Sequence, residues 1–231
     1  MKGLFVTATD TGAGKTTLLC RLIPVLEKAG FALCIRKPVE SGCQPDQDHL
    51  ATSDAAALAG ASHTKPSTEQ VCAYRLRRAC SPARAAQLEN VELTVTKLAA
   101  ACTTDNGNTL LVEGAGGFYS PIARDGLNAD LACTLGLPLL LLVEDRLGCI
   151  NHSLLTIEAA QHRRLEIAAV VVNQTTPINN TDTDNYKELK ALTDVPVFKV
   201  AYTENNRGNT PDIKLLADHL INQYLRNGPK P

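Results

Sequence analysis

A glycine-rich loop near the start of the chain carries the residue types needed to hold a phosphate chain. Residues 8–17 read Ala-Thr-Asp-Thr-Gly-Ala-Gly-Lys-Thr-Thr and separate an apolar run from a helix-like pattern. Small residues let backbone N–H groups face a phosphate, and the start of a helix adds partial positive charge. The usual pattern has glycine at Thr9, yet the loop still predicts binding of Mg-ATP. The contacting residues would be Gly12, Ala13, Gly14, Lys15, Thr16 and Thr17, with Lys15 on the β- and γ-phosphates and Thr16 on Mg²⁺.

Glu113 is the second candidate, because it follows a strongly apolar run and precedes a glycine turn in Leu-Leu-Val-Glu-Gly-Ala-Gly-Gly at 110–117. A carboxylate at the carboxyl end of a buried strand is suited to hold Mg²⁺ against phosphates. We therefore expect Glu113 to bind the metal and Gly116 to contact the nucleotide. The alternative is an exposed glutamate that only begins a glycine loop.

Two further charged residues could join this site. Lys37 follows a second strand-like run in Arg-Lys-Pro-Val-Glu-Ser-Gly at 36–42, and its ammonium could neutralise charge that develops during phosphoryl transfer. The alternative is a surface lysine before a proline turn. Asp54 opens a helical stretch, where it could be a second metal carboxylate or an acid favoured by the helix dipole. The sequence leaves both alternatives open.

Two other segments carry candidate binding groups. Gly148, Cys149, Ile150 and Asn151 precede a helical pattern whose first N–H groups could bind an anion, unless the asparagine is an ordinary helix cap. Asn173 ends the apolar run Val-Val-Val-Asn, and its amide could pair with the edge of adenine. A turn-forming asparagine is the competing interpretation.

These residues need a scaffold that brings the ends of several strands together. A run such as 139–143, apolar at every position, is typical of a strand buried on both faces of a parallel sheet. Strands are predicted at 4–8, 32–35, 110–112, 137–143 and 167–172, and helices at 17–29, 127–135, 151–161 and 213–225. The predicted fold is therefore α/β: a single-domain, doubly wound, mostly parallel sheet with helices on both faces, as in P-loop NTPases.

Composition restricts the class of partner. Residues 1–231 are enough for one well-buried domain, with 227–231 as a short flexible C-terminal tail. A net charge of −1, from 23 basic and 24 acidic residues, favours small molecules over nucleic acid. No apolar run approaches the length of a membrane span. The eight cysteines form no Cys-x-x-Cys pair, which indicates reduced thiols in the cytoplasm.

Taken together, these motifs resemble those of the dethiobiotin synthases in residue type and order. The resemblance covers about residues 3–175. It rests on the loop at 9–16, the Lys-Pro-Val turn with Ser41 and Gly42, Ser-Asp-Ala at 53–55, Ser-Pro at 81–82, Val-Glu-Gly-Ala-Gly-Gly at 112–117, Leu-Gly-Cys-Ile-Asn-His at 147–152, and Asn173.

The resemblance implies a P-loop ligase domain that makes dethiobiotin from 7,8-diaminopelargonate, CO₂ and ATP. In that family CO₂ adds to one amine of the substrate to give a carbamate, which attacks the γ-phosphate. The other amine then attacks the resulting carbamic-phosphoric anhydride, so that ring closure expels phosphate and leaves a cyclic urea.

The resemblance also implies roles for single residues and a partner. The Mg²⁺ ligands would be Thr16, Asp54 and Glu113, and the groups acting on phosphate and carbamate would be Lys15 and Lys37. The diamine end of the substrate would be held by Thr11 and Ser41. The distal carboxylate would bind at the helix start formed by Gly148, Cys149, Ile150 and Asn151 of a partner subunit. The active enzyme would therefore be a homodimer with its site at the subunit interface.

The chain departs from the family pattern in places, and other functions stay open. Ala8 and Ala83 replace the usual glycine and histidine, and the Gly-x-Ile-Pro that helps hold adenine is not recognisable at 198–203. One alternative is a nucleotide-switched ATPase of the partitioning type, although those proteins have a lysine at the place of Asp10. Another is an amide-forming ligase, which usually carries a glutamine-hydrolysing domain. A catalytically inactive nucleotide-binding protein is the third.

Overall fold

Helices separate the successive strands of the central sheet along the chain, as the apolar periodicity predicted. The computed structural model describes residues 2–43, 53–103, 107–177, 184–204 and 210–226, so the predicted tail at 227–231 lies outside them. The strands are β1 (Gly3–Ala8), β2 (Leu33–Arg36), β3 (Val39–Ser41), β4 (Tyr74–Leu76), β5 (Thr109–Glu113), β6 (Pro121–Ala123), β7 (Gly126–Leu127), β8 (Leu139–Glu144), β9 (Ile167–Asn173) and β10 (Val197–Val200).

The helices connect these strands. They are α1 (Lys15–Lys28), α2 (Asp54–Ala61), α3 (Thr68–Val71), α4 (Pro82–Leu88), α5 (Val95–Ala100), α6 (Asn128–Leu135), α7 (Cys149–His162), α8 (Asn185–Leu192) and α9 (Pro211–Leu220), which continues into a π-helical turn (Ile221–Leu225). None of the helices in the described ranges combines the length and the apolarity that crossing a membrane requires.

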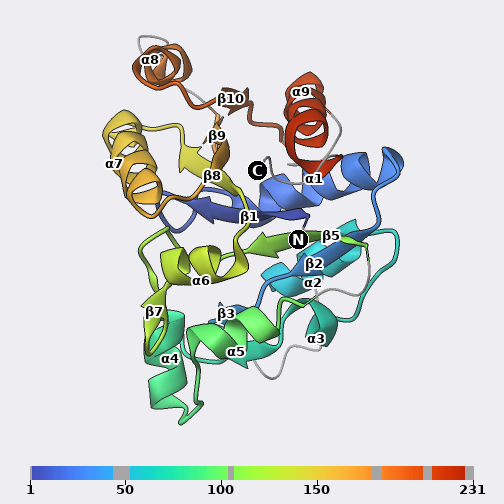
Figure 1. Cartoon of the computed structure of the whole chain (residues 1–231), viewed down its shortest axis with the longest axis vertical. Helices are drawn as coiled ribbons and strands as arrows, with labels where there is room; N and C mark the ends of the chain where they lie inside the picture. The colour runs from blue at the N-terminus through green and yellow to red at the C-terminus, as the bar shows by residue number, and fades with distance from the viewer. Residues whose placement is uncertain (1, 44–52, 104–106, 178–183, 205–209, 227–231) are drawn as a thin grey trace.

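Six strands form one parallel sheet in the order β10-β9-β8-β1-β5-β2 (Figure 1). The chain begins in the middle of this sheet, because β1 pairs with both β5 and β8. All pairs in the sheet are parallel, so the carboxyl ends of its strands meet at one edge. The prediction of a doubly wound, mostly parallel sheet is confirmed.

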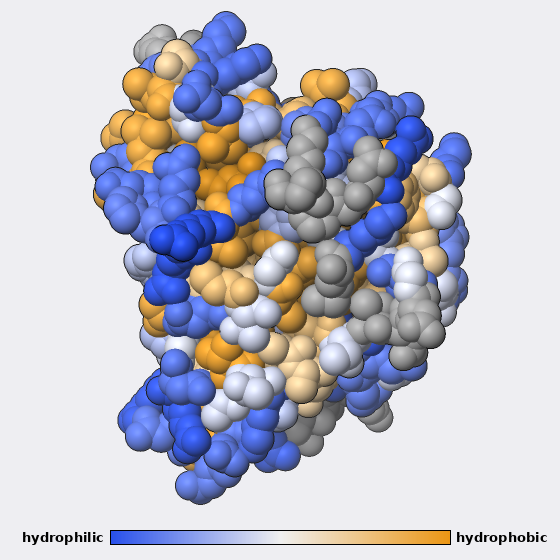
Figure 2. Space-filling model, viewed as in Figure 1, coloured by the Kyte–Doolittle hydropathy of each residue, from blue (hydrophilic) through white to orange (hydrophobic). Residues whose placement is uncertain are grey.

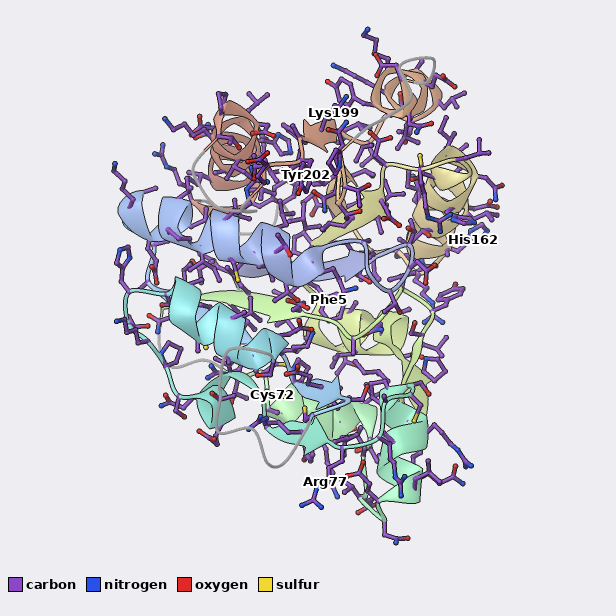
Figure 3. The ribbon with its side chains drawn as sticks, turned by 180° about the vertical axis from the view of Figure 1, so that it is seen from behind. Phe5, Cys72, Arg77, His162, Lys199 and Tyr202 are labelled. Carbon is purple, nitrogen blue, oxygen red and sulfur yellow. The ribbon has the colours of Figure 1, made fainter. Side chains whose placement is uncertain are left out.

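Side chains of the sheet alternate between two hydrophobic clusters, one on each face. In β1, Leu4, Val6 and Ala8 pack in the same cluster as α1, α2 and α9. Phe5 belongs to the other cluster, which includes residues of α4, α5, α6, α7 and α8. Figure 3 shows Phe5 at the centre of the molecule and the exposed Arg77 at its periphery. Burial on both faces explains why the central strands are apolar at most positions.

Several short elements were not predicted. Residues 61–90 contain α3, β4 and α4, each of three to seven residues, which is too short for a hydrophobic period to be recognised. The edge strand β10 has only four residues, and one of them, Lys199, is exposed. Parallel pairing of β3 with β4 brings Ser41 opposite Leu76, beside the start of the segment that leads to α4.

All eight cysteines are free thiols. Burial raises the pKa of Cys72 and of Cys102 to about 12, and it also raises the pKa of Cys149. A thiol whose pKa is raised by desolvation stays protonated at neutral pH and reacts slowly. These cysteines therefore act as small hydrophobic side chains.

We predict that a maleimide at neutral pH modifies the exposed Cys80 and Cys133 in the folded protein and leaves Cys72 and Cys102 unmodified until denaturant is added. The reason is that the two buried thiols are neither accessible nor ionised. Mass spectrometry of the labelled peptides gives the order of reaction. Rapid labelling of Cys102 in the native protein would contradict its place in the core.

Candidate active site

One cavity of about 290 Å³ collects most of the residues singled out in the sequence. It lies where the loops that follow β1, β2 and β5 meet, because these three strands are neighbours in the sheet and end at the same edge. The residues lining it are Thr11, Gly12, Gly14, Lys15, Thr16, Thr17, Lys37, Asp54, Glu113 and Gly116. All ten are sequence candidates, and their roles remain predictions.

The start of α1 is built to receive an anion. Its N-cap, Gly14, has a left-handed φ of 84°, and no described side chain caps the helix or places an acid in its first turn. A Cβ at Gly14 would lie 2.4 Å from the Asn173 amide nitrogen, so only glycine fits there. The free N–H groups and the positive end of the helix dipole are left for a ligand at the cavity.

Asn173 supports this loop. Its Nδ2 donates to the carbonyl oxygen of Ala13 over 2.9 Å, and the residue is only 6% exposed at the end of β9. The turn-forming asparagine considered above is therefore wrong. Val200 pairs in register with Asn173, which places the 198–203 segment beside it. Figure 3 shows Lys199 and Tyr202 of that segment close together, far from Arg77.

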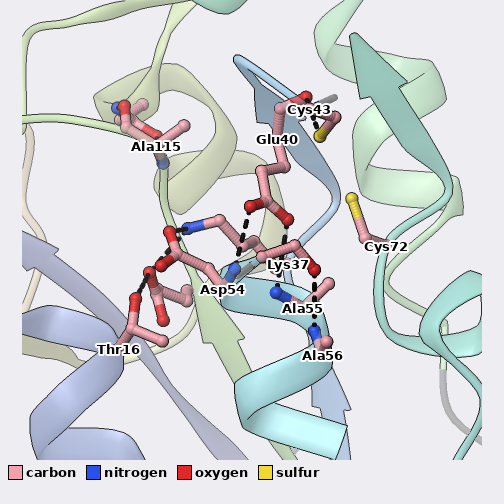
Figure 4. Close-up of polar contacts among 12 residues, drawn as sticks. Thr16, Lys37, Glu40, Cys43, Asp54, Ala55, Ala56, Cys72 and Ala115 are labelled. Atoms are coloured by element: carbon pink, nitrogen blue, oxygen red, sulfur yellow. Dashed lines mark hydrogen bonds and ion pairs between the residues drawn. The ribbon is translucent and has the colours of Figure 1, made fainter. Parts of the chain in front are cut away.

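A buried ammonium lies between two carboxylates in the cavity. Lys37 Nζ is 2.6 Å from Glu113 Oε1 and 2.8 Å from Asp54 Oδ2 (Figure 4). Lys37 is 3% exposed and Glu113 is 1% exposed. The alternatives of a surface lysine and an exposed glutamate are therefore wrong. Thr16 Oγ1 donates to the same Glu113 oxygen over 2.8 Å, which connects α1 to the cluster.

Charge pairing decides the protonation of this cluster. Burial alone would lower the pKa of Lys37, but the carboxylates of Glu113 and Asp54 outweigh it and hold that pKa above its ordinary value. Burial would raise the pKa of Asp54, but the Lys37 ammonium and hydrogen bonds from Lys37 and Thr16 hold it below its ordinary value. Lys37 and Asp54 are thus both charged at neutral pH. Lys15 differs, since burial, together with the Lys37 ammonium, lowers its pKa more than the nearby carboxylates raise it.

The cluster has the donor groups that a divalent cation needs. Glu113 Oε2 is buried without a hydrogen-bond partner among the described residues, and such an oxygen is costly unless a ligand satisfies it. Within the described ranges no group of three or more His, Cys, Asp or Glu side chains could hold a metal by itself. A cation here would take its remaining ligands from phosphate and water, as Mg²⁺ commonly does. Thr16, Asp54 and Glu113 therefore fit Mg²⁺.

The other predicted residues lie outside the lining of this cavity. Ser41 Oγ donates to the carbonyl oxygen of Cys80 over 2.7 Å. The start of α7 resembles that of α1, because its N-cap Gly148 has a left-handed φ of 89° and no described side chain caps it. The cap is thus this glycine, and the interpretation of Asn151 as an ordinary cap is wrong. The free N–H groups of α7 keep the anion-site prediction open.

Two buried polar residues near the cavity were missed. Asn128 is fully buried: its amide accepts from the N–H of Ala115 and donates to the carbonyls of Ala115 and Gly117, which fixes the turn after Glu113. Glu40 accepts from backbone N–H groups at the start of α2. Both act on backbone groups distant in sequence, so no spacing of residue types could have indicated them.

Known sequences resemble this chain along most of its length. A family model described as an AAA domain matches residues 2–203. The chain is 38% identical to an ATP-dependent dethiobiotin synthetase of Vesicomyosocius okutanii subsp. Calyptogena okutanii, over 89% of this chain and 92% of the relative. It is 38% identical to a protein of the same name from Anaeromyxobacter dehalogenans, over 84% and 86% of the two chains. For one from Yersinia pestis the identity is 33%, over 86% and 84%.

Solved structures share the fold at much lower identity. The cell division ATPase MinD of Pyrococcus furiosus superposes with a TM-score of 0.55 at 14% identity, over 96% of this chain and 99% of that chain. A chain of the MinC:MinD complex of Aquifex aeolicus gives 0.56 at 13% identity, over 96% and 97%. At such identities the likeness establishes the P-loop NTPase fold alone.

We predict that Lys37→Met lowers the free energy of unfolding by about 3–5 kcal/mol, because it leaves the Glu113 carboxylate buried without its cation. Adding Glu113→Gln to the same chain should recover most of this loss, since the uncompensated charge is then removed. Denaturant unfolding followed by circular dichroism measures both changes. If the double variant is less stable than Lys37→Met, charge compensation is not what holds the pair.

Proposed function

The chain belongs to the dethiobiotin synthetase family, and we propose that it is an ATP-dependent cyclo-ligase that forms the ureido ring of dethiobiotin from 7,8-diaminopelargonate and CO₂. The observation that carries the proposal is the cavity in which a P-loop meets Lys37, Asp54 and Glu113. This function is favoured over that of a partitioning ATPase, whose loop lysine is replaced here by Asp10.

The proposed reaction has three steps. CO₂ adds to one amine of the substrate and gives a carbamate, with loss of a proton. A carbamate oxygen attacks the γ-phosphorus of ATP and ADP leaves, which forms a carbamic-phosphoric anhydride. The second amine attacks the carbonyl carbon of this anhydride, and the ring closes as phosphate departs. Such chemistry depends on alignment and charge neutralisation more than on covalent catalysis by the protein.

The cavity offers groups for each charge in this reaction. Lys15 and Lys37 would neutralise the γ-phosphate and the carbamate, and the raised pKa keeps Lys37 cationic near neutral pH. Thr16, Asp54 and Glu113 would hold Mg²⁺, supported by the Oε2 of Glu113, which has no hydrogen-bond partner in the part of the chain that the structure describes. When bound, Mg²⁺ would neutralise negative charge on the β- and γ-phosphate oxygens.

The diamine end of the substrate would be held by Thr11 and Ser41. Thr11 lines the cavity, and its hydroxyl lies near Gly116. The Ser41 hydroxyl donates a hydrogen bond to the carbonyl oxygen of Cys80. Its oxygen is therefore left to accept a hydrogen bond from an amine. The two hydroxyls would thereby orient the nitrogen atoms for carbamate formation and ring closure.

We further propose a homodimer in which the start of α7 binds the substrate's distal carboxylate in the partner's site. Gly148, Cys149, Ile150 and Asn151 do not line the cavity of their own chain, yet they begin a helix with free N–H groups. Hydrophobic side chains gather on the surface over α7 (Figure 2). Leu155 of α7 is 58% exposed, and Leu147 just before it is 90% exposed, as expected where a second copy packs.

Other elements of the proposal concern the chain as a whole. It would act as one domain spanning residues 1–231 in the cytoplasm, in line with its eight free thiols. Adenine would bind near Asn173, whose Nδ2 uses one of its two N–H groups to bind the carbonyl oxygen of Ala13. The second N–H and the amide oxygen would be left to pair with the edge of the base.

The proposal is tested with purified protein, Mg-ATP, bicarbonate and 7,8-diaminopelargonate. We expect phosphate and a cyclic urea in equal amounts, and we expect Lys15→Ala to lower kcat by at least about 100-fold because phosphate charge is then not neutralised. Lys28→Ala, at the far end of the same helix, is the control and should keep full activity. ATP turnover independent of the diamine, without a urea product, would instead support a nucleotide switch.

We predict that Leu147→Glu converts a dimer into a monomer and raises the KM for 7,8-diaminopelargonate, because a buried carboxylate would oppose both packing and binding of the substrate carboxylate. Affinity for Mg-ATP should stay unchanged. Leu192→Glu in α8, where the leucine is 57% exposed, is the matched control. Analytical ultracentrifugation and substrate kinetics measure the two effects, and a Leu147→Glu variant that remains dimeric would contradict this interface.

A further inference from the structure

Glu40 is a buried carboxylate that the proposed reaction does not use. It lies on β3, is only 9% exposed, and is not among the residues that line the cavity. Its Oε1 accepts from the N–H of Asp54 over 2.8 Å, and its Oε2 accepts from the N–H of Ala55 over 3.2 Å (Figure 4). Both carboxylate oxygens are thus used to hold the first turn of α2.

The first turn of α2 has a second side-chain cap. The N-cap Ser53 accepts from the N–H of Ala56 over 3.1 Å, so the first three amides of the helix all have side-chain partners. A carboxylate at this position is also favoured by the helix dipole. The starts of α1 and α7 lack described side-chain caps and stay free for ligands, whereas the start of α2 is filled from within the protein.

Both the backbone and the side chain of Asp54 are fixed by contacts with the segment that carries Lys37 and Glu40. It is the first residue of α2, so the peptide group that Glu40 binds is the one that carries the Asp54 side chain. Lys37, three residues before Glu40 in the same segment, pairs with the Asp54 carboxylate over 2.8 Å. Glu40 therefore fixes the backbone of Asp54 while Lys37 fixes its side chain.

We propose that Glu40 is a positioning residue that orients Asp54 for the divalent cation. This inference rests on the proposed function, because it takes Asp54 as a metal ligand. Glu40 itself touches neither cation nor substrate. Without it two N–H groups of the first turn lose their acceptors, and the turn gains freedom to move the Asp54 carboxylate away from the site. Partners that orient metal ligands commonly contribute about 10–100-fold to metal affinity.

The test uses the wild type, Glu40→Ala, Asp54→Ala and the double variant. For each protein, titration calorimetry compares the affinity for a non-hydrolysable ATP analogue with and without Mg²⁺, and the ratio is the gain due to the metal. We expect Asp54→Ala to reduce this gain and Glu40→Ala to reduce it about 10-fold. The double variant should lose no more than Asp54→Ala alone, because Glu40 acts only through Asp54.

Two further measurements separate positioning from a general loss of stability or charge. Thr94→Ala removes an equivalent cap from α5, where Thr94 accepts from the N–H of Lys97, and it should leave the metal gain unchanged. Glu40→Gln keeps one acceptor and the shape of the side chain, so it should fold even if the alanine variant does not, and it should show an intermediate loss. Hydrogen exchange at the amides of Asp54 and Ala55 should accelerate in both variants.

The outcomes are distinguishable. An equal loss on Glu40→Ala with and without Asp54 would mean that Glu40 acts as a distant charge, and the positioning role would be overturned. A wild-type metal gain in a folded Glu40 variant would overturn it as well. A wild-type gain in Asp54→Ala would remove the metal role of Asp54 from the proposed function, and this inference with it.

Discussion

The ammonium of Lys37 is the contact on which the site depends, because it joins parts of the chain that come from different strands and helices. It pairs with Glu113 at the end of β5 and with Asp54 at the start of α2, and Thr16 reaches the same cluster from α1. A carboxylate as buried as that of Glu113 is tolerated only with a cation close by. The packing of the sheet and the arrangement of the cavity therefore depend on each other, because moving these strand ends apart would leave the Glu113 carboxylate without its cation.

The fold could be predicted wherever the hydrophobic pattern was long enough. Five of the six strands in the central sheet and the helices α1, α6, α7 and α9 are apolar over enough residues for period and length to identify them. The strand order could not be predicted, since it depends on which faces pack together. The short pair β3 and β4, which carries Ser41 and Glu40, has no period and is stabilised by tertiary contacts.

The site residues that could be predicted are those that follow a strand in the sequence. Thr16, Lys37 and Glu113 each follow an apolar run, so a parallel sheet was bound to bring them to one edge. For Asp54 the two alternatives are compatible: it is the first residue of a helix and its carboxylate faces the cavity. Glu40 and Asn128 could not be found, because their partners are backbone groups whose positions only the folded chain defines.

The far ends of α1 and α2 are also joined. Glu27, near the end of α1, accepts from the Ser62 hydroxyl over 2.6 Å and from the His63 N–H over 3.0 Å, just past the end of α2. Glu27 thus joins the two helices directly at this end, whereas beside the cavity Thr16 of α1 and Asp54 of α2 are linked through Glu113 and Lys37. A change in the separation of Thr16 and Asp54 would therefore strain the contacts of Lys37 or those of Glu27. The distance between the two ends of the cavity is thus set partly by contacts at the opposite end of the helices, far from the cavity itself.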